Sequence, residues 1–299
     1  MRLLEWKLKP HDWMIAYTRQ TEWIERRGIF LWLAFVAGGL GGGLYLVSLF
    51  FNSLWGMFTG WLIIVVLKGG FHLAYLGKPL RFWRIVLRPQ TSWIARGLIF
   101  VALFIGFGVI QLGFSYWLPG TAGEAIFKVL AGIIAFAVIA YTGFAMNYVK
   151  GIPFWNSALL PVLYISSGIL AGFGLITAIG LYDGNVDIAA AETGSRWLLI
   201  VSALIIAIYL WSATYMGTTG KQSVIEQIRG SVAPVFWVGV VMLGIIIPIA
   251  ISVSSYYAGE VSRLLLIIAI ISELIGSLAL KYSILKVGIY TPLLPTSAY

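Results

Sequence analysis

The chain has 299 residues, of which 60% are hydrophobic and only 10% are charged, and its mean hydropathy is +0.94. Soluble domains carry about 25% charged residues, so this composition excludes a soluble globular protein. The absence of cysteine excludes disulfides and cysteine-bound iron–sulfur clusters within this chain. The net charge of +9 is not taken as a sign of nucleic-acid binding, because basic residues in a membrane protein usually report its orientation.

Residues 1–27 form a charged amino-terminal segment that mixes basic and acidic side chains and is too charged for a signal peptide. Residues 28–285 are an apolar membrane domain, and residues 286–299 form a carboxy-terminal tail. About 20 helical residues cross the hydrocarbon layer. This length predicts eight spans, near residues 28–52, 54–76, 94–117, 124–148, 157–181, 195–218, 232–254 and 262–284.

The segments are continuously apolar and lack the alternation of membrane β-strands, so we predict an all-α integral membrane protein with eight transmembrane helices. Glycines crowd the first and fifth spans, where small residues let helix backbones approach closely. The similar stretches 36–44 and 165–173 favour a parallel repeat of two four-helix bundles, residues 28–148 and 157–284. The alternative is that membrane helices are simply rich in glycine.

Basic residues gather on one face of the predicted bundle, in the amino-terminal segment and the even-numbered connections. The connection after the second span alone contributes Lys78, Arg81, Arg84, Arg88 and Arg96. The positive-inside rule then places both termini in the cytoplasm, at the prokaryotic inner membrane. The alternative is that this face docks an acidic partner subunit or binds lipid phosphates.

The second span carries Lys68, His72 and Tyr75 at intervals of three to four residues, so the three side chains share one helix face. This face predicts the polar wall of a pocket. Membrane b-type haem commonly has two axial histidines, and the sequence offers only His11 and His72, so no haem is expected.

Several motifs are more distinctive than any span. They are Leu76-Gly-Lys-Pro-Leu-Arg-Phe-Trp-Arg, Ser92-Trp-Ile-Ala-Arg-Gly, Tyr141-Thr-Gly-Phe and Pro153-Phe-Trp-Asn-Ser-Ala-Leu-Leu-Pro. With the glycine-rich first span, they make the chain resemble the polysulfide reductase type of membrane subunit, the NrfD-like family, over nearly its whole length. Many relatives have Asp where this chain has Tyr75, and arginine where it has Lys78.

The resemblance implies a quinone-binding membrane anchor of eight helices in two bundles, without haem. It also implies an iron–sulfur partner subunit that serves a molybdenum or tungsten catalytic subunit. Under this interpretation the chain does not turn over alone. The quinone is menaquinone or ubiquinone, and Arg81, Arg84, Arg88 and Arg96 are candidates for docking the partner.

A quinone that exchanges electrons with a partner must bind near the partner-facing surface, and His72, Tyr75 and Tyr141 are suitably shallow. Tyr141 is the first candidate donor, because its motif resembles the family's quinone-contacting region. His72 can donate a hydrogen bond or carry a proton, and Trp32 can stack on the ring. The alternatives are a buried tyrosine bonded to a carbonyl, a histidine that joins helices, and an interfacial tryptophan.

Lys68 and Glu273 are ionisable groups inside predicted spans, where they normally pair or line a wet pathway. The two residues form either a structural ion pair or parts of a proton route. Asp183, Asp187 and Glu192 follow the fifth span with irregular spacing, and we predict an exposed, solvated loop there rather than a calcium site.

These observations favour a membrane subunit that exchanges electrons between quinone and an iron–sulfur partner. A secondary transporter that uses Lys68 and Glu273 is one alternative. A structural anchor that has lost its quinone site is another.

Overall fold

The structure, a computed structural model, describes residues 12–258 and 262–294. Within that part of the chain, eight helical segments are long and apolar enough to cross a membrane, as predicted. They are Gly28–Phe50, Leu54–Tyr75, Trp93–Trp117, Ala122–Asn147, Leu159–Gly180, Ile188–Ala213, Val235–Ala258 and Arg263–Lys286. The protein is therefore an all-α integral membrane protein.

Six spans are single α-helices: α2 (Gly28–Phe50), α5 (Trp93–Trp117), α6 (Ala122–Asn147), α7 (Leu159–Gly180), α8 (Ile188–Ala213) and α11 (Arg263–Lys286). The second span joins α3 (Leu54–Leu62), the π-helix η1 (Ile63–Lys68) and α4 (Gly69–Tyr75). The seventh joins the π-helix η3 (Val235–Ile246) and α10 (Ile247–Ala258). Short elements outside the spans are α1 (Asp12–Ile15), β1 (Thr18–Arg19), the 3₁₀ helix η2 (Pro79–Leu87), α9 (Gly217–Arg229) and β2 (Ile289–Tyr290).

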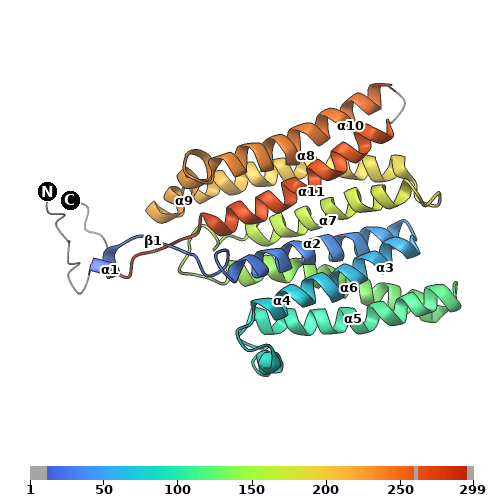
Figure 1. Ribbon diagram of the computed structural model, residues 1–299, viewed down its shortest axis with the longest axis horizontal. Coiled ribbons are helices and arrows are strands. Elements are labelled where there is room, and N and C mark those ends of the chain that lie inside the picture. The colour runs from blue at the N-terminus through green and yellow to red at the C-terminus, as the bar shows by residue number, and fades with distance from the viewer. Residues whose placement is uncertain (1–11, 259–261, 295–299) are drawn as a thin grey trace.

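The spans form two groups that lie side by side (Figure 1). The amino-terminal half contains α2, the α3–α4 span, α5 and α6, and the carboxy-terminal half contains α7, α8, the η3–α10 span and α11. Helices α2 and α7 run along the middle of the molecule, where the two halves meet.

Glycines form the seam between α2 and α7. A Cβ atom added to Gly43 would overlap the carbonyl oxygen of Gly168, and one added to Gly172 would overlap the backbone of Gly43. A Cβ at Gly39 would lie 3.6 Å from the Cα of Gly168. Gly39 and Gly43 occupy the same places in the stretch 36–44 that Gly168 and Gly172 occupy in 165–173. Corresponding positions of the two similar stretches thus meet, which supports the repeat as a proposal.

The described ends of the chain lie at one end of the bundle together with η2 and α9, and we call this the basic end (Figure 1). There β1 pairs antiparallel with β2, with Thr18 opposite Tyr290. The Arg19 guanidinium lies 3.0 Å from the Glu226 carboxylate of α9. Partial burial raises the pKa of Glu226, but hydrogen bonds from Ser231 and the charge of Arg19 outweigh it and leave the pKa below its ordinary value.

The acidic loop differs from the prediction. Helix α8 begins at Ile188, seven residues earlier than expected, because the Asp187 carboxylate accepts a hydrogen bond from the backbone N–H of Ala190 at 3.0 Å and caps the helix. Glu192 therefore lies within α8 and is buried, whereas Asp183 and Asp187 remain outside the helix. The prediction of a solvated position was wrong for Glu192.

We expect Gly43→Ala to destabilise the protein by about 1–3 kcal/mol, because the added methyl group would meet the backbone of α7, which cannot move aside as a side chain can. Gly106→Ala is the matched control, since a Cβ there meets nothing within 4 Å. The unfolding midpoint of each variant in mixed micelles measures the effect. Equal midpoints for the two variants would contradict a seam that depends on glycine.

Candidate functional site

Lys68, His72 and Tyr141 meet inside the amino-terminal half and form what we call the Lys68 cluster. Lys68 ends the π-helix η1, and His72 follows one turn later in α4. The Tyr141 hydroxyl of α6 lies 3.3 Å from His72 Nε2, and Lys68 Nζ lies 4.8 Å from the centre of the Tyr141 ring. The structure thus brings together three of the residues that the sequence singled out.

Two glycines leave room for the cluster. A Cβ on Gly97 of α5 would overlap the Tyr141 ring, so this glycine seats the tyrosine against α5. A Cβ on Gly38 of α2 would lie 2.6 Å from Lys68 Nζ. Gly97 closes the Ser92-Trp-Ile-Ala-Arg-Gly motif and Gly38 belongs to the glycine-rich first span, so both sequence features serve the position of these side chains.

The Lys68 amine is 1% exposed, and it donates one long hydrogen bond, 3.3 Å, to the carbonyl oxygen of Ala34. No carboxylate of the described residues lies within ion-pair distance of it. The Tyr141 ring supplies a cation–π contact, which offsets only part of the cost of burying a charge. An amine held in a membrane span without a counter-ion is typical of a functional site.

His72 presents one satisfied and one unsatisfied nitrogen. Its Nε2 faces Tyr141, while its Nδ1 is buried and has no hydrogen-bond partner. A buried ring nitrogen left unpaired costs free energy unless another group comes to it. The donor set of the cluster, with one open position, therefore fits a ligand that carries oxygen acceptors.

The two other predicted quinone contacts lie differently. The Trp32 indole donates a hydrogen bond to the carbonyl oxygen of Leu278 at 3.3 Å, and its ring meets Tyr282 edge-on at 5.5 Å, so Trp32 faces α11. Tyr75 is half-buried and, like Trp32, packs against the large apolar cluster that extends into the carboxy-terminal half.

Glu273 and Lys68 do not form an ion pair. The Glu273 carboxylate of α11 accepts a hydrogen bond from the Ser195 hydroxyl of α8 at 2.8 Å, whereas Lys68 contacts α2 and α6. Of the two alternatives for this pair, the structural ion pair is therefore excluded.

The structure adds a second buried amine, Lys281 of α11, which a count of charges assigns to the basic face. Lys281 is 1% exposed, and its Nζ donates to the hydroxyls of Ser167 at 2.9 Å and Ser277 at 2.8 Å. The available sequence signal was its place inside the eighth span, one helical turn after Ser277.

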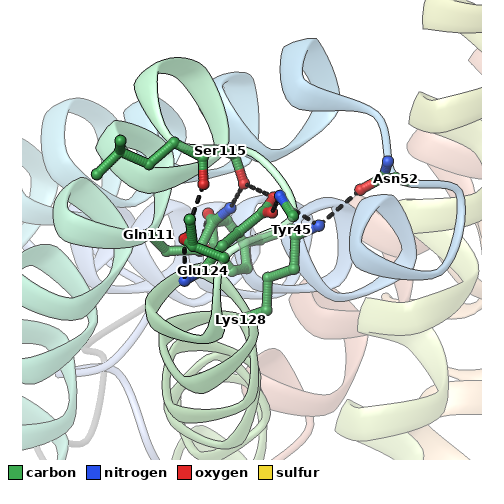
Figure 2. A network of polar contacts seen from close by, with 9 residues as sticks. Tyr45, Asn52, Gln111, Ser115, Glu124 and Lys128 are labelled. Carbon is green, nitrogen blue, oxygen red and sulfur yellow. Dashed lines mark hydrogen bonds and ion pairs between the residues drawn. The ribbon is translucent and has the colours of Figure 1, made fainter.

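A second polar network, which no sequence motif indicated, joins α2, α5 and α6 at the other end of the amino-terminal half (Figure 2). The Tyr45 hydroxyl donates to Gln111 at 2.6 Å, and Gln111 donates to Ser115 at 2.8 Å. Ser115 then donates to Glu124 at 2.6 Å. The other carboxylate oxygen of Glu124 accepts from the Gly120 N–H, and Lys128 pairs with Glu124 at 2.8 Å. Because both carboxylate oxygens are bonded, this network holds the helices together.

The predicted docking arginines divide into two kinds. Arg96 donates to the carbonyl oxygens of Pro89 and Gln90, each at 2.8 Å, and lies over the Trp93 ring, so it holds its own loop in place. Arg81, Arg84 and Arg88 are exposed at the basic end, beside equally exposed apolar side chains such as Leu80 and Leu87. Their mixture of charge and apolar area is typical of a surface that meets a partner or lipid headgroups.

Comparison with known proteins decides the family. Residues 29–293 match the family described as "Polysulphide reductase, NrfD", which is nearly all of the chain. The chain belongs to the NrfD family. The predicted resemblance is therefore confirmed.

Three relatives show how far the similarity extends. One chain of the polysulfide reductase of Wolinella succinogenes is 24% identical over 71% of this chain and 74% of its own length. The NrfD homologue of Haemophilus influenzae is 26% identical over 73% of this chain and 75% of its own. One subunit of the tetrathionate reductase of Salmonella typhimurium is 24% identical over 55% of this chain and 50% of its own. Each of these relatives thus aligns with more than half of this NrfD-family chain.

If the Lys68 amine serves a ligand rather than the fold, Lys68→Met should leave the protein as stable or stabilise it by roughly 1 kcal/mol, because a buried charge is replaced by an apolar side chain. Lys128→Met is the control, since it removes the ion pair with Glu124 and should destabilise the protein. Unfolding in mixed micelles measures both. A Lys68→Met variant as unstable as Lys128→Met would assign Lys68 a structural role.

Proposed function

We propose that this protein is the membrane subunit of a respiratory oxidoreductase complex, in which it binds quinone or quinol and exchanges electrons between it and an iron–sulfur partner. The observation that carries the proposal is the Lys68 cluster. It combines an unpaired buried amine, an imidazole with one open nitrogen and a tyrosine hydroxyl in a single place within an apolar bundle.

The cluster supplies what a quinone headgroup needs, which is an apolar slot with a few well-placed polar groups. The His72 imidazole and the Tyr141 hydroxyl can donate hydrogen bonds to a carbonyl oxygen, and the Lys68 charge favours electron density nearby. Menaquinone and ubiquinone, when bound, take up two electrons and two protons. Tyr75 and Trp32 remain proposed contacts of the ring or its tail.

The electrons must reach the site from another subunit. The chain has no cysteine for an iron–sulfur cluster, and we infer no haem because it has only two histidines, of which His11 lies outside the described residues. The names of the relatives, which include subunits of polysulfide and tetrathionate reductases, support a partner with iron–sulfur clusters and a molybdenum or tungsten catalytic subunit.

We further propose that the partner docks on Arg81, Arg84 and Arg88, with Arg96 keeping their loop in shape. These groups are at the same end of the bundle as His72, so a docked cluster would approach the quinone site. The charge distribution favours cytoplasmic termini and a basic end that faces the cytoplasm of a prokaryotic cell. We also keep Lys68 and Glu273 as members of a proton route.

Tyr141→Phe and His72→Ala should each lower the quinone that co-purifies with the native complex by about tenfold, since each removes one hydrogen bond worth roughly 1–1.5 kcal/mol in a water-poor site. Tyr45→Phe is the matched control, because Tyr45 is a buried tyrosine of the same half that bonds Gln111 instead. Extraction and chromatography measure the quinone per complex. Equal quinone in all variants would contradict this site, and no quinone in the unaltered complex would favour a transporter or a structural anchor.

Reversing charge on η2, as in Arg81→Glu with Arg84→Glu, should remove the iron–sulfur partner from the purified complex, most completely at high salt. Arg263→Glu, a reversal at the opposite end of the bundle, is the control and should retain the partner. Quantitative mass spectrometry of the purified complex gives the ratio of subunits. Retention of the partner by the η2 variant would place docking elsewhere.

A further inference from the structure

The carboxy-terminal half contains two small polar cavities that meet at Glu273. In the larger one the centre of a water molecule can occupy about 30 Å³, and in the smaller about 20 Å³. About 10–15 Å³ of such space suffices for one water, so each cavity has room for at least one. Ser166, Ser167, Ser202 and Ser277 line the larger cavity, and Ser195, Glu192 and Ser252 line the smaller.

Two groups in the larger cavity lack partners. Glu273 is 7% exposed, and while its Oε1 accepts from Ser195, its Oε2 is buried without a hydrogen bond. The Ser202 hydroxyl is likewise buried and unpartnered. Gly174 leaves the space beside Oε2 open, since a Cβ there would lie 2.9 Å from this oxygen. A water held between these groups would satisfy both.

Glu273 contrasts with Glu124, another carboxylate buried in a span. Both oxygens of Glu124 are bonded and it pairs with Lys128. Glu273 instead has one free oxygen that faces a cavity, and no described basic group lies within ion-pair distance of it. A structural carboxylate would be paired as Glu124 is, so the surroundings of Glu273 fit a group that gains and loses a proton.

Polar groups continue from Glu273 in both directions along the bundle. Toward the end opposite the basic end, the smaller cavity reaches Glu192 and Ser252, and Arg196 donates to the Ser252 hydroxyl at 2.8 Å. Toward the basic end, the larger cavity reaches Ser167 and Ser277, which both bond Lys281. Glu273 and Lys281 are eight residues apart on α11, or about 12 Å along the helix.

The glycines of α2 bring this series next to the Lys68 cluster. A Cβ on Gly39 would lie 3.5 Å from Lys281 Nζ, and a Cβ on the preceding residue, Gly38, would lie 2.6 Å from Lys68 Nζ. The two buried amines therefore contact adjacent residues of the same helix, one from each half of the protein.

We propose that the carboxy-terminal half contains a hydrated proton pathway, centred on Glu273, that connects the end opposite the basic end with Lys281 and, across Gly38 and Gly39, with the Lys68 cluster. The proposal rests on the proposed function only for its last step, delivery to or from the quinone site. Water in the smaller cavity gives a proton to the Glu273 carboxylate, which becomes a neutral carboxylic acid. Through water in the larger cavity the acid passes a proton to the neutral Lys281 amine, which becomes an ammonium ion.

The first test needs no partner. The full chain in lipid nanodiscs is titrated and followed by infrared spectroscopy of the C=O stretch of protonated carboxyl groups. We expect a band that appears as pH falls, shifts when H₂O is replaced by D₂O, and is absent from Glu273→Gln but present in Glu124→Gln. Failure of Glu273→Gln to remove a titrating band, or a band that does not shift in D₂O, would overturn the hydrated pathway.

The second test uses the whole complex in sealed vesicles, with quinol as electron donor and a pH-sensitive dye. Glu273→Gln and Lys281→Met should each slow proton movement by about tenfold or more, whereas Glu124→Gln should not. Equal proton movement in all vesicles, or none in the unaltered complex, would overturn the connection to the quinone site. If the unaltered complex transferred no electrons from quinol, the proposed function would fail, and the infrared result would still decide the cavity itself.

Discussion

The close approach of α2 and α7 is the constraint on which the rest of the structure depends. Without side chains on Gly43, Gly168 and Gly172, the two backbones meet in the middle of the molecule and hold the halves against each other. In lipid, helix association draws little on the hydrophobic effect, so such van der Waals contact has to carry it. The same helix has Gly38 and Gly39 facing the two buried amines, so one glycine-rich segment serves both packing and chemistry.

Polar groups in the spans fall into two classes that differ in how fully they are bonded. The Tyr45–Glu124 network closes on itself and has the properties of a helix clamp (Figure 2). The Lys68 cluster and the surroundings of Glu273 have open positions, namely His72 Nδ1 and Glu273 Oε2. Unsatisfied groups are costly in the low dielectric of a membrane protein, so an open position is a stronger sign of function than burial alone.

Two π-helical segments lie next to these open positions. Lys68 is the last residue of η1, and η3 packs directly against α11, which carries Glu273 and Lys281. A π-helix widens the backbone turn and re-aims side chains, and it occurs frequently at functional sites. Each half of the protein thus has one π-helical segment beside its buried ionisable groups.

The sequence by itself determined the class, the number of spans, the family and most of the Lys68 cluster. Spans follow from continuous apolar length, and Lys68 and His72 share a helix face by spacing alone. It misjudged Glu192 and Lys281, because both lie near the ends of spans, where a charge count cannot tell an exposed side chain from a buried one. Only the tertiary structure separated Glu273 from Lys68 and turned Trp32 toward α11. The physical reason is that the rotation of each helix, and thus which neighbour a side chain meets, is set by packing between helices distant in sequence.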